Sequence, residues 1–420
     1  MQEIHLGLHR IQALMGALGN PHRKFAVLHI AGTNGKGSVA AMSESILRHA
    51  GWTTGLYTSP HLVRLEERIQ VNGRRISGAR LCSLAARVQR KETALLRAGK
   101  LDRPLSYFEF ITGCAFLHFA EQRIGVAVVE VGLGGRLDAT NIVDPAASVI
   151  TGIALDHEAI LGNTIEKIAA EKAGIIRSGV PVISGCRGNA RRVIQAQARK
   201  QNAPLLEIDR HCSIRTLREC GGRFSLDLNT PLRPYRALHL ALAGEHQMRN
   251  AALAVTAVEA LRAFPVRIAD VHHGLSLARW PGRMDEYRIP RRTLLDGAHN
   301  TEGALLLKSH LLKRKARDLH LVFGVLRDKD LRKIGNHLFP LAKTIHLTGL
   351  ANSRAMKPEE IAQSHKRFLS RIRLHKNSRE AIQAAWQECP RHGMVVVAGS
   401  LYLIGEVLPL VQRHNRAKMR

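Results

Sequence analysis

The chain has few aromatic residues, no paired cysteines and no long apolar segment. Phe, Trp and Tyr make up 4% of its 420 residues, which leaves few rings on which nucleic-acid bases could stack. The six cysteines are scattered without a Cys-x-x-Cys pair, which excludes a zinc ribbon or a disulfide framework and is typical of reduced thiols. No apolar run reaches about 18 residues, and residues 1–10 contain no signal-peptide pattern. We therefore expect a cytoplasmic protein with no membrane partner.

Acidic residues are also scarce relative to basic ones. The sequence has 34 Asp and Glu against 63 Lys and Arg, for a formal net charge of +29. Such an excess either attracts anions, from nucleotides to nucleic acid, or belongs to a solvated surface with a basic bias. Basic runs such as 313–317 and 413–420 fall on helix-like or terminal segments, which favours the solvated surface. With so few aromatic residues, we expect no nucleic-acid partner.

The length and the segment pattern predict two α/β domains. A chain of this size exceeds one ordinary core. In its first half, strand-like and helix-like segments alternate, as in a mostly parallel sheet covered by helices. The expected strands are 25–31, 54–57, 126–131, 147–153 and 180–184, and the expected helices are 39–49, 77–98, 107–121, 164–176 and 189–200. Residues 205–242 have the pattern of an antiparallel appendage, and a helix is expected at 247–262.

A second alternating series follows the break at Trp280-Pro281-Gly282-Arg283. Its expected strands are 293–296, 320–324, 344–347 and 394–398, and its expected helices are 301–314, 331–339, 358–365 and 378–388. The series predicts a smaller, Rossmann-like domain. We expect the two domains to cover residues 1–284 and 285–420.

The most informative segment is the glycine-rich turn at residues 32–38, Gly-Thr-Asn-Gly-Lys-Gly-Ser. It joins an apolar strand to a helix-like stretch. Its glycines let backbone N–H groups face a phosphate chain, Lys36 adds a positive charge, and the helix start adds its dipole. Ile30 and Gly37 stand where the general P-loop has a glycine and a hydroxyl, and the hydroxyl comes at Ser38. This shorter form marks a subset of ATP-using enzymes, so the first domain is predicted to be P-loop-type and to bind ATP.

Polar residues follow the other expected strands. Glu130 ends a buried-strand run, where a carboxylate could hold magnesium on ATP, although the loop after it equally fits a capped surface loop. Ser59 and His157 come just after two further strands, although a lone histidine is usually structural. Arg283 could bind a phosphate through two nitrogens or pair on the surface. Because both domains direct polar loops from strand ends, ATP is expected between them.

Taken together, these segments resemble the folylpolyglutamate synthases and bifunctional dihydrofolate synthase/folylpolyglutamate synthases of the Mur ligase superfamily. The resemblance extends over nearly the whole chain, and it is the joint order and spacing of the motifs that is specific. Besides the turn, the motifs are SPHL (59–62), GLGGRLDATN (132–141), LDH (155–157), EKAG (171–174), GEHQ (244–247), WPGR (280–283), LDGAHN (295–300) and GSLY (399–402).

The resemblance implies an ATP-dependent amide ligase that adds L-glutamate to dihydropteroate or to reduced folates through an acyl phosphate. It implies ATP binding by Gly32, Thr33, Asn34, Gly35, Lys36, Gly37, Ser38, Asn250, Arg283, Asp296 and His299. It implies magnesium, at one or two sites, near Ser59, Glu130, His157 and Lys172, with a monovalent cation as a further candidate. Catalytic roles are implied for Lys36, Glu130, His157 and Lys172, the last as a carbamoylated lysine. Tyr107, Phe108, Glu109 and Asp138 match positions that line the pterin site, and a monomer is expected.

Two alternatives stay open at this point. A cell-wall Mur ligase would share the ATP turn, but such enzymes usually carry an extra N-terminal domain, and here the turn begins at residue 32. A nucleic-acid-binding NTPase would fit the charge of +29 and would bind with a steep dependence on salt.

Overall fold

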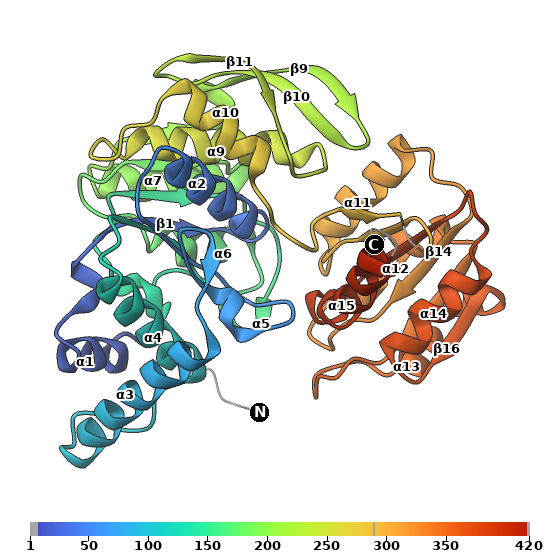
Figure 1. Cartoon of the computed structure of the whole chain (residues 1–420), viewed down its shortest axis with the longest axis horizontal. Coiled ribbons are helices and arrows are strands. Elements are labelled where there is room, and N and C mark those ends of the chain that lie inside the picture. Colours follow the sequence, from blue (N-terminus) through green and yellow to red (C-terminus); the bar gives the residue numbers. More distant parts are fainter. Residues whose placement is uncertain (1–6, 289, 418–420) are drawn as a thin grey trace.

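The protein folds into two α/β units that lie side by side (Figure 1). The computed structural model describes residues 7–288 and 290–417. Residues 1–6 of the N-terminal segment and residues 418–420 of the basic tail, both considered above, lie outside the described residues. Each unit is built on its own sheet.

The N-terminal unit contains an eight-stranded sheet in the described part of the chain, in the order β4-β3-β2-β5-β1-β6-β7-β8. In the part of the sheet from β2 to β8 all neighbouring strands run parallel, and the β2–β3 and β3–β4 pairs are antiparallel. The strands are β1 (Ala26–Ala31), β2 (Thr54–Tyr57), β3 (Ile69–Val71), β4 (Arg74–Arg75), β5 (Val126–Glu130), β6 (Ala147–Ile150), β7 (Val182–Ser184) and β8 (Leu205–Glu207). The helices are α1 (His9–Ala17), α2 (Lys36–His49), α3 (Gly78–Arg97), α4 (Tyr107–Glu121), α5 (Glu158–Leu161), α6 (Ile165–Ala173), α7 (Gly188–Lys200), α8 (Ile208–His211), α9 (His246–Ala260) and α10 (Ile268–Leu277).

Apolar side chains of the central strands point alternately to the two faces of this sheet, and they contribute to a hydrophobic core on each face. Leu28 and Val128 pack on the side of α2, α9 and α10. Val27 and Val129 pack on the opposite side, with α1, α3 and α4. Because side chains alternate with a period of two along a strand, one apolar strand can serve both cores.

A three-stranded antiparallel sheet covers α9 and α10 at one end of this unit (Figure 1). It consists of β9 (Ser213–Cys220), β10 (Arg223–Asn229) and β11 (Pro234–His239). The sequence predicts this appendage, but its expected start is wrong. Residues 205–207 form β8, the edge strand of the parallel sheet, paired with β7. A three-residue strand gives too short a pattern to show which sheet it joins.

The C-terminal unit contains, among the described residues, a six-stranded sheet in the order β12-β13-β17-β14-β15-β16, parallel except for the β12–β13 pair. Its strands are β12 (Asp285–Tyr287), β13 (Thr293–Leu295), β14 (Leu319–Phe323), β15 (Thr344–Thr348), β16 (Ile372–His375) and β17 (Met394–Ala398). Its helices are α11 (Thr301–Lys313), α12 (Leu331–Leu338), α13 (Pro358–Ser364), α14 (Ser378–Glu388) and α15 (Leu401–Ala417). One face packs on α11, α12 and α13, and the other on α14 and α15.

The expected α/β class with two mostly parallel sheets is confirmed. Several elements are absent from the predicted series, namely the short strands β3, β4, β12 and β16 and the helices α1, α5, α8, α10 and α15. The missed strands lie at or next to the edges of their sheets. An edge strand can be buried on one face or on neither, so it does not need a continuous run of apolar residues. Their hydrophobic pattern is therefore weak.

Candidate active site

The glycine-rich turn lies between β1 and α2 and has a backbone that only glycine adopts easily. Gly32 and Gly35 have φ angles of +145° and +89°. A Cβ atom at Gly32 would lie 1.9 Å from Thr151 Oγ1, and one at Gly35 would lie 2.7 Å from Asn250 Oδ1. Since α2 begins at Lys36, its first backbone N–H groups are free to bind an anion at the turn.

Lys36 folds back over this turn. Its ammonium group donates hydrogen bonds to the carbonyl oxygens of Gly32 and Thr33, each at 3.1 Å. The same nitrogen lies 4.0 Å from Glu130 Oε1. Carbonyl dipoles and one carboxylate therefore hold the charge of Lys36 beside the free N–H groups of α2.

Glu130 is the last residue of β5 and is buried. Burial raises the pKa of its carboxyl group, while the charge of Lys36 and a hydrogen bond from the Ser59 N–H (3.3 Å) oppose the rise. Parallel pairing of β2, β5 and β1 places the turn, Ser59 and Glu130 at the same edge of the sheet. These sequence-predicted residues are thus brought together.

Lys172 reaches the same turn from α6. Its side chain is buried, and its Nζ donates to the Gly32 carbonyl at 2.8 Å. Burial, and then the nearby charge of Lys36, lower the pKa of Lys172 to about 7. Its amine is therefore partly neutral at neutral pH, which is unusual for a lysine.

The loop after β5 fixes the position of α6. A Cβ at Gly135 would lie 2.8 Å from the Glu171 carbonyl oxygen, so only glycine lets the loop approach the helix this closely. Arg136 pairs with the Glu171 carboxylate at 2.8 Å, and Asn141 donates to the Gly174 carbonyl at 3.1 Å. These contacts direct Lys172 toward the turn, which its amphipathic helix pattern does not indicate.

His157 stands at the N-cap of α5 with a φ of +53°. Burial lowers the pKa of its imidazole to about 4, although the neighbouring Asp156 carboxylate opposes this. Its Nε2 lies 3.9 Å from Asp156 Oδ1. At neutral pH the ring is thus neutral, with a lone pair available as an acceptor or ligand.

The C-terminal unit contributes the loop after β13. The buried Asp296 accepts hydrogen bonds from the backbone N–H groups of Met284 and Ala298, both at 2.9 Å. Burial raises the pKa of Asp296, and the Arg283 guanidinium opposes the rise. His299 contacts the Gly297 carbonyl through Nδ1 at 2.7 Å, which holds the ring against its own loop.

Contacts between the units place this loop against the turn. Asn300 Nδ2 donates to Asn34 Oδ1 at 3.1 Å, and Asn34 Nδ2 in turn donates to Asn300 Oδ1 and to Glu302. Elsewhere between the units, a Cβ at Gly405 of α15 would lie 1.9 Å from the Leu62 carbonyl oxygen. The ATP-type turn and the SPHL motif therefore both contact the C-terminal unit.

A buried ion pair between the units is missing from the residues predicted for the site. Asp156 lies 2.6 Å from Lys329 Nζ, and both side chains are less than a tenth exposed. Burial alone would raise the pKa of Asp156, but the contact with His299 and the charges of His157 and Lys329 hold it well below its usual range. Asp156 follows β6 and Lys329 follows β14, so only their positions after strands could have suggested them.

Gln247 is a second omission. It is fully buried at the start of α9 and donates to Ser38 Oγ at 3.3 Å. It also accepts a hydrogen bond from Asn250 Nδ2 at 2.9 Å. Through these two bonds α9 holds the start of α2. Gln247 belongs to the GEHQ motif, which is the sequence feature that could have identified it.

The residues predicted for the pterin site differ in their surroundings. Tyr107 is 45% exposed, and the Arg68 guanidinium lies over its ring at 5.5 Å. The Phe108 ring covers Gly132, where a Cβ would lie 2.5 Å from it. These two aromatic side chains lie near the loop that follows β5.

The two acidic members of this set have partners within the protein. Glu109 is buried, pairs with Arg10 at 3.2 Å, and caps the start of α4 by accepting the Ser106 N–H at 2.7 Å. Asp138 is buried and accepts the N–H groups of Thr140 and Leu133, both at 2.9 Å. Their geometry serves local structure, and a role in substrate binding stays a prediction.

Among the described residues, no helix combines the length and the apolar character needed to cross a bilayer. The six cysteines all carry free thiols.

Comparison with known proteins assigns the family. Residues 30–258 match the Mur ligase middle domain, and residues 282–401 match the Mur ligase glutamate ligase domain. The chain is 35% identical to the dihydrofolate synthase/folylpolyglutamate synthase of Bacillus subtilis, over 96% of this chain and 94% of that protein. It is 37% identical to the Mycobacterium tuberculosis protein of the same name, over 90% and 82% of the two chains.

Solved structures agree with this assignment. The M. tuberculosis folylpolyglutamate synthase complexed with ADP and AMPPCP has a TM-score of 0.92 and 34% identity, over 96% of this chain and 95% of that one. Escherichia coli FolC in complex with DHPP and ADP has a TM-score of 0.89 and 30% identity, over 98% and 95%. The chain belongs to the folylpolyglutamate synthase/dihydrofolate synthase family of Mur ligases.

Proposed function

We propose that the protein is an ATP-dependent ligase that adds L-glutamate to dihydropteroate and to reduced folates. Its relatives carry the names of both activities, and two related structures hold adenine nucleotides. The observation that carries the proposal is the meeting of Lys36, Glu130 and Lys172 at one glycine-rich turn. Such a concentration of buried charge is costly unless a charged ligand uses it.

The turn is proposed to bind the phosphates of ATP. The backbone of Gly32–Ser38 and the start of α2 offer N–H groups, and Lys36 offers a positive charge beside them. A carboxylate of the pteroate or folate attacks the γ-phosphorus, ADP leaves, and an acyl phosphate forms. The amine of glutamate then attacks the acyl carbon, and phosphate leaves with formation of the amide. The protein contributes positioning and charge neutralisation.

The donor set also fits magnesium. Glu130 is a buried carboxylate whose cationic neighbour is 4.0 Å away, and the Ser59 hydroxyl adds a hard oxygen ligand of the kind magnesium prefers. His157 is a softer donor, and its part in this set rests on the family resemblance. When bound at one or two sites, magnesium would supply positive charge against the phosphates. A monovalent cation is kept as a further prediction.

Lys172 is proposed to be carbamoylated. A neutral amine attacks the carbon of CO2, a proton leaves the nitrogen, and the product is an N-carboxylate. The lowered pKa of Lys172, about 7, supplies the neutral amine at physiological pH. The reaction turns a buried cation into an oxygen donor suited to magnesium.

The remaining assignments are proposed on the same basis. Asn250, Arg283, Asp296 and His299 are proposed to contact the nucleotide, and Tyr107, Phe108, Glu109 and Asp138 the pterin. A division into domains 1–284 and 285–420 is supported by the start of β12 at Asp285. A monomeric, cytoplasmic enzyme is proposed, and the free thiols support that location.

One assay tests the function. Purified protein is given ATP, magnesium and glutamate, with either dihydropteroate or tetrahydrofolate as acceptor, and phosphate release is measured beside product mass. We expect release only when glutamate and an acceptor are both present, with both acceptors used. Release without glutamate, or release stimulated by nucleic acid instead of an acceptor, would contradict the proposal. Use of tetrahydrofolate alone would limit the protein to folylpolyglutamate synthesis.

A further inference from the structure

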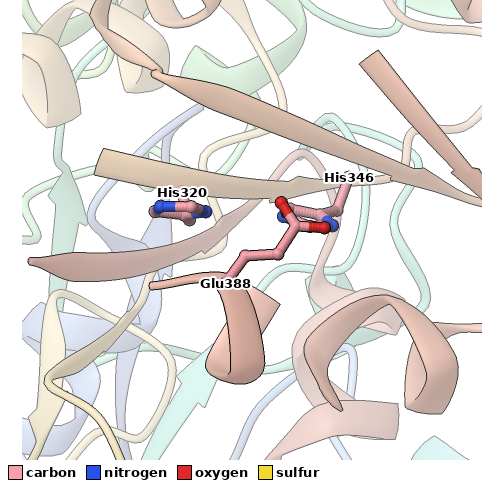
Figure 2. Close-up of side chains that lie close together, drawn as sticks. All are labelled: His320, His346 and Glu388. Atoms are coloured by element: carbon pink, nitrogen blue, oxygen red, sulfur yellow. The ribbon is translucent and has the colours of Figure 1, made fainter. Parts of the chain in front are cut away.

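Three potential metal ligands gather in the C-terminal unit, away from the proposed ATP site. They are His320 of β14, His346 of β15 and Glu388 at the end of α14. Figure 2 shows the two histidines on neighbouring strands and the Glu388 carboxylate beside the His346 ring. One ligand atom from each residue can be chosen so that all three lie within 4.8 Å of one another.

The strand register explains why these side chains share a face. His320 pairs with Thr344, and Val322 pairs with His346. Residues two apart on a strand point the same way, so His320 and His346 are diagonal neighbours on the face covered by α14. His320 is the second residue of β14, whereas Lys329 of the ATP-side loop follows the other end of that strand. The cluster therefore belongs to a different part of the unit.

The two histidines have ring nitrogens that find no partner among residues 7–288 and 290–417. His320 is 3% exposed and His346 is fully buried. In this described part of the chain, neither ring nitrogen of His320, nor Nε2 of His346, has a hydrogen-bond partner. Buried polar groups are nearly always satisfied, and each exception needs an explanation. A metal ion would accept the lone pairs that hydrogen bonds leave unused.

A third histidine, His375, determines which ring nitrogen of His346 is available to bind a metal ion. His346 Nδ1 lies 3.0 Å from Nε2 of His375, on β16. If Nδ1 carries the hydrogen and donates it to His375, then Nε2 of His346 holds a free lone pair, 3.8 Å from Glu388 Oε2. Metal-bound histidines usually have such an outer partner.

We propose that His320, His346 and Glu388 bind one divalent first-row transition metal ion, with Zn²⁺ as the probe cation. Two imidazoles and a carboxylate are a donor set for zinc, and a water would complete four-coordination. Zinc ligand atoms in a tetrahedron are roughly 3.3 Å apart, so the cluster must contract slightly. Glu388, which is 41% exposed at a helix end, can supply that movement. The ion would link β14, β15 and α14.

The alternative is a plain stack of neutral imidazoles. The His320 and His346 rings lie 5.9 Å apart at 28°, and the His346 and His375 rings 5.2 Å apart at 27°. Such a stack fills space without a metal. It predicts no zinc affinity at this place, so titration separates it from the proposal.

The test is a Zn²⁺ titration of the chelator-treated full chain against a chromophoric competitor, followed by Co²⁺ absorption. We expect one tight site in the wild type, a Co²⁺ spectrum typical of four-coordination, and a rise in Tm with Zn²⁺ but not with Mg²⁺. Glu388→Ala, on the surface and safe for folding, should weaken binding at least about tenfold. His320→Leu should do the same while removing an unpartnered ring.

Two controls make the test specific. His392→Ala removes an exposed histidine paired with Asp318 and should leave the tight site unchanged. His375→Leu should weaken Zn²⁺ binding by about 10–100-fold, whereas His375→Gln keeps an acceptor for His346 Nδ1 and should retain most of the affinity. No tight Zn²⁺ site in the wild type, or an unchanged site in both Glu388→Ala and His320→Leu, would overturn the proposal.

Discussion

The two units bury ionisable side chains in different ways. In the N-terminal unit, Lys36 and Lys172 both donate to the Gly32 carbonyl, so two amines share one turn. In the C-terminal unit, His320 and His346 lie on a strand face, and burial lowers the pKa of both rings so that they are neutral. Burial penalises charge in both units. At the glycine-rich turn, free backbone carbonyls accept hydrogen bonds from both amines, although burial still lowers the pKa of Lys172 to about 7. A regular strand has already used its carbonyls in the sheet.

This difference indicates what each region can bind. A turn with the Lys36 side chain beside free N–H groups suits an anion such as a phosphate chain. A pair of neutral imidazoles with free lone pairs suits a cation of the transition series. Variants that remove the charge at the turn should therefore affect catalysis far more than variants at the contacts between the units.

The largest effect is expected at Lys172. Lys172→Ala should abolish turnover, because it removes the amine that becomes a carbamate. Steady-state assays measure the loss, and circular dichroism checks that the fold is intact. Lys167→Ala, an exposed lysine on the same helix, should keep full activity. Near-normal turnover of Lys172→Ala would contradict the carbamate role.

The rate at which Lys172 becomes carbamoylated should depend on pH. Because the pKa of Lys172 is lowered to about 7, its neutral, reactive form grows as pH rises through that value. After CO2 removal, activity restored at the same concentration of dissolved CO2 should therefore return faster about one unit above pH 7 than about one unit below it. Equal rates on the two sides would remove the support that this lowered pKa gives to carbamoylation.

Lys36→Met should have the next largest effect. The variant keeps the side chain's length but removes the charge beside the phosphates, and we expect kcat to fall by about 10²–10³-fold, as for other lost transition-state contacts. Phosphate release under saturating substrates measures it. Lys91→Met, on the exposed side of α3, is the matched control. A fall in kcat smaller than about tenfold would show that Lys36 is not a principal phosphate contact.

The Asp156–Lys329 pair should have an intermediate effect. A double-mutant cycle with Asp156→Asn and Lys329→Met, read through kcat/KM for ATP, should give a coupling of about 0.5–3 kcal/mol, because both partners are buried. Asp156 has a pKa below its unfolded value of about 3.9, so its contribution is present above that value and is lost only as pH falls through the lowered one. The coupling should thus be the same at about pH 7 and about pH 5, and strictly additive single variants would exclude a contact that matters for ATP.

The smallest effect is expected at Lys313 and Glu245, an ion pair that also joins the units. Both side chains are about half exposed, at 51% and 56%. Solvent screens such a pair, so Lys313→Ala should change the free energy of unfolding by about 0–1 kcal/mol and leave kcat unchanged. Denaturant unfolding measures the first quantity. A larger effect here than at Asp156 would reverse the expected order of the two contacts.

The local pattern was enough for much of the fold. Residues 54–57, 107–121, 378–388 and 394–398 are predicted with the bounds that β2, α4, α14 and β17 have. These elements have long apolar runs or clear turn signals at their ends. The three-residue strand β8 has neither. Its expected place in the antiparallel appendage is wrong, because three residues do not show which strand they pair with, and β8 pairs with β7.

The candidate site likewise contains residues that the local sequence pattern reveals and residues that it does not. The turn, Glu130 and Ser59 could be found because each follows a strand at the carboxyl edge of a parallel sheet. Lys172 could be found only through the family resemblance, since its helix has an ordinary amphipathic pattern. Asp156 and Lys329 are 173 residues apart, and no local pattern links them.

The glycine-rich turn, the alternation of strands and helices, and the polar residues at strand ends follow from the amino-acid sequence alone, because they depend on backbone freedom and on the period of apolar residues. The inward direction of Lys172 beside Lys36, and the contact of Asp156 with Lys329, come from the packing of the folded chain. The same packing also sets His320 beside His346. The physical reason is that burial and the distance between charges, which set the pKa and the chemistry of each group, arise only when distant segments pack together.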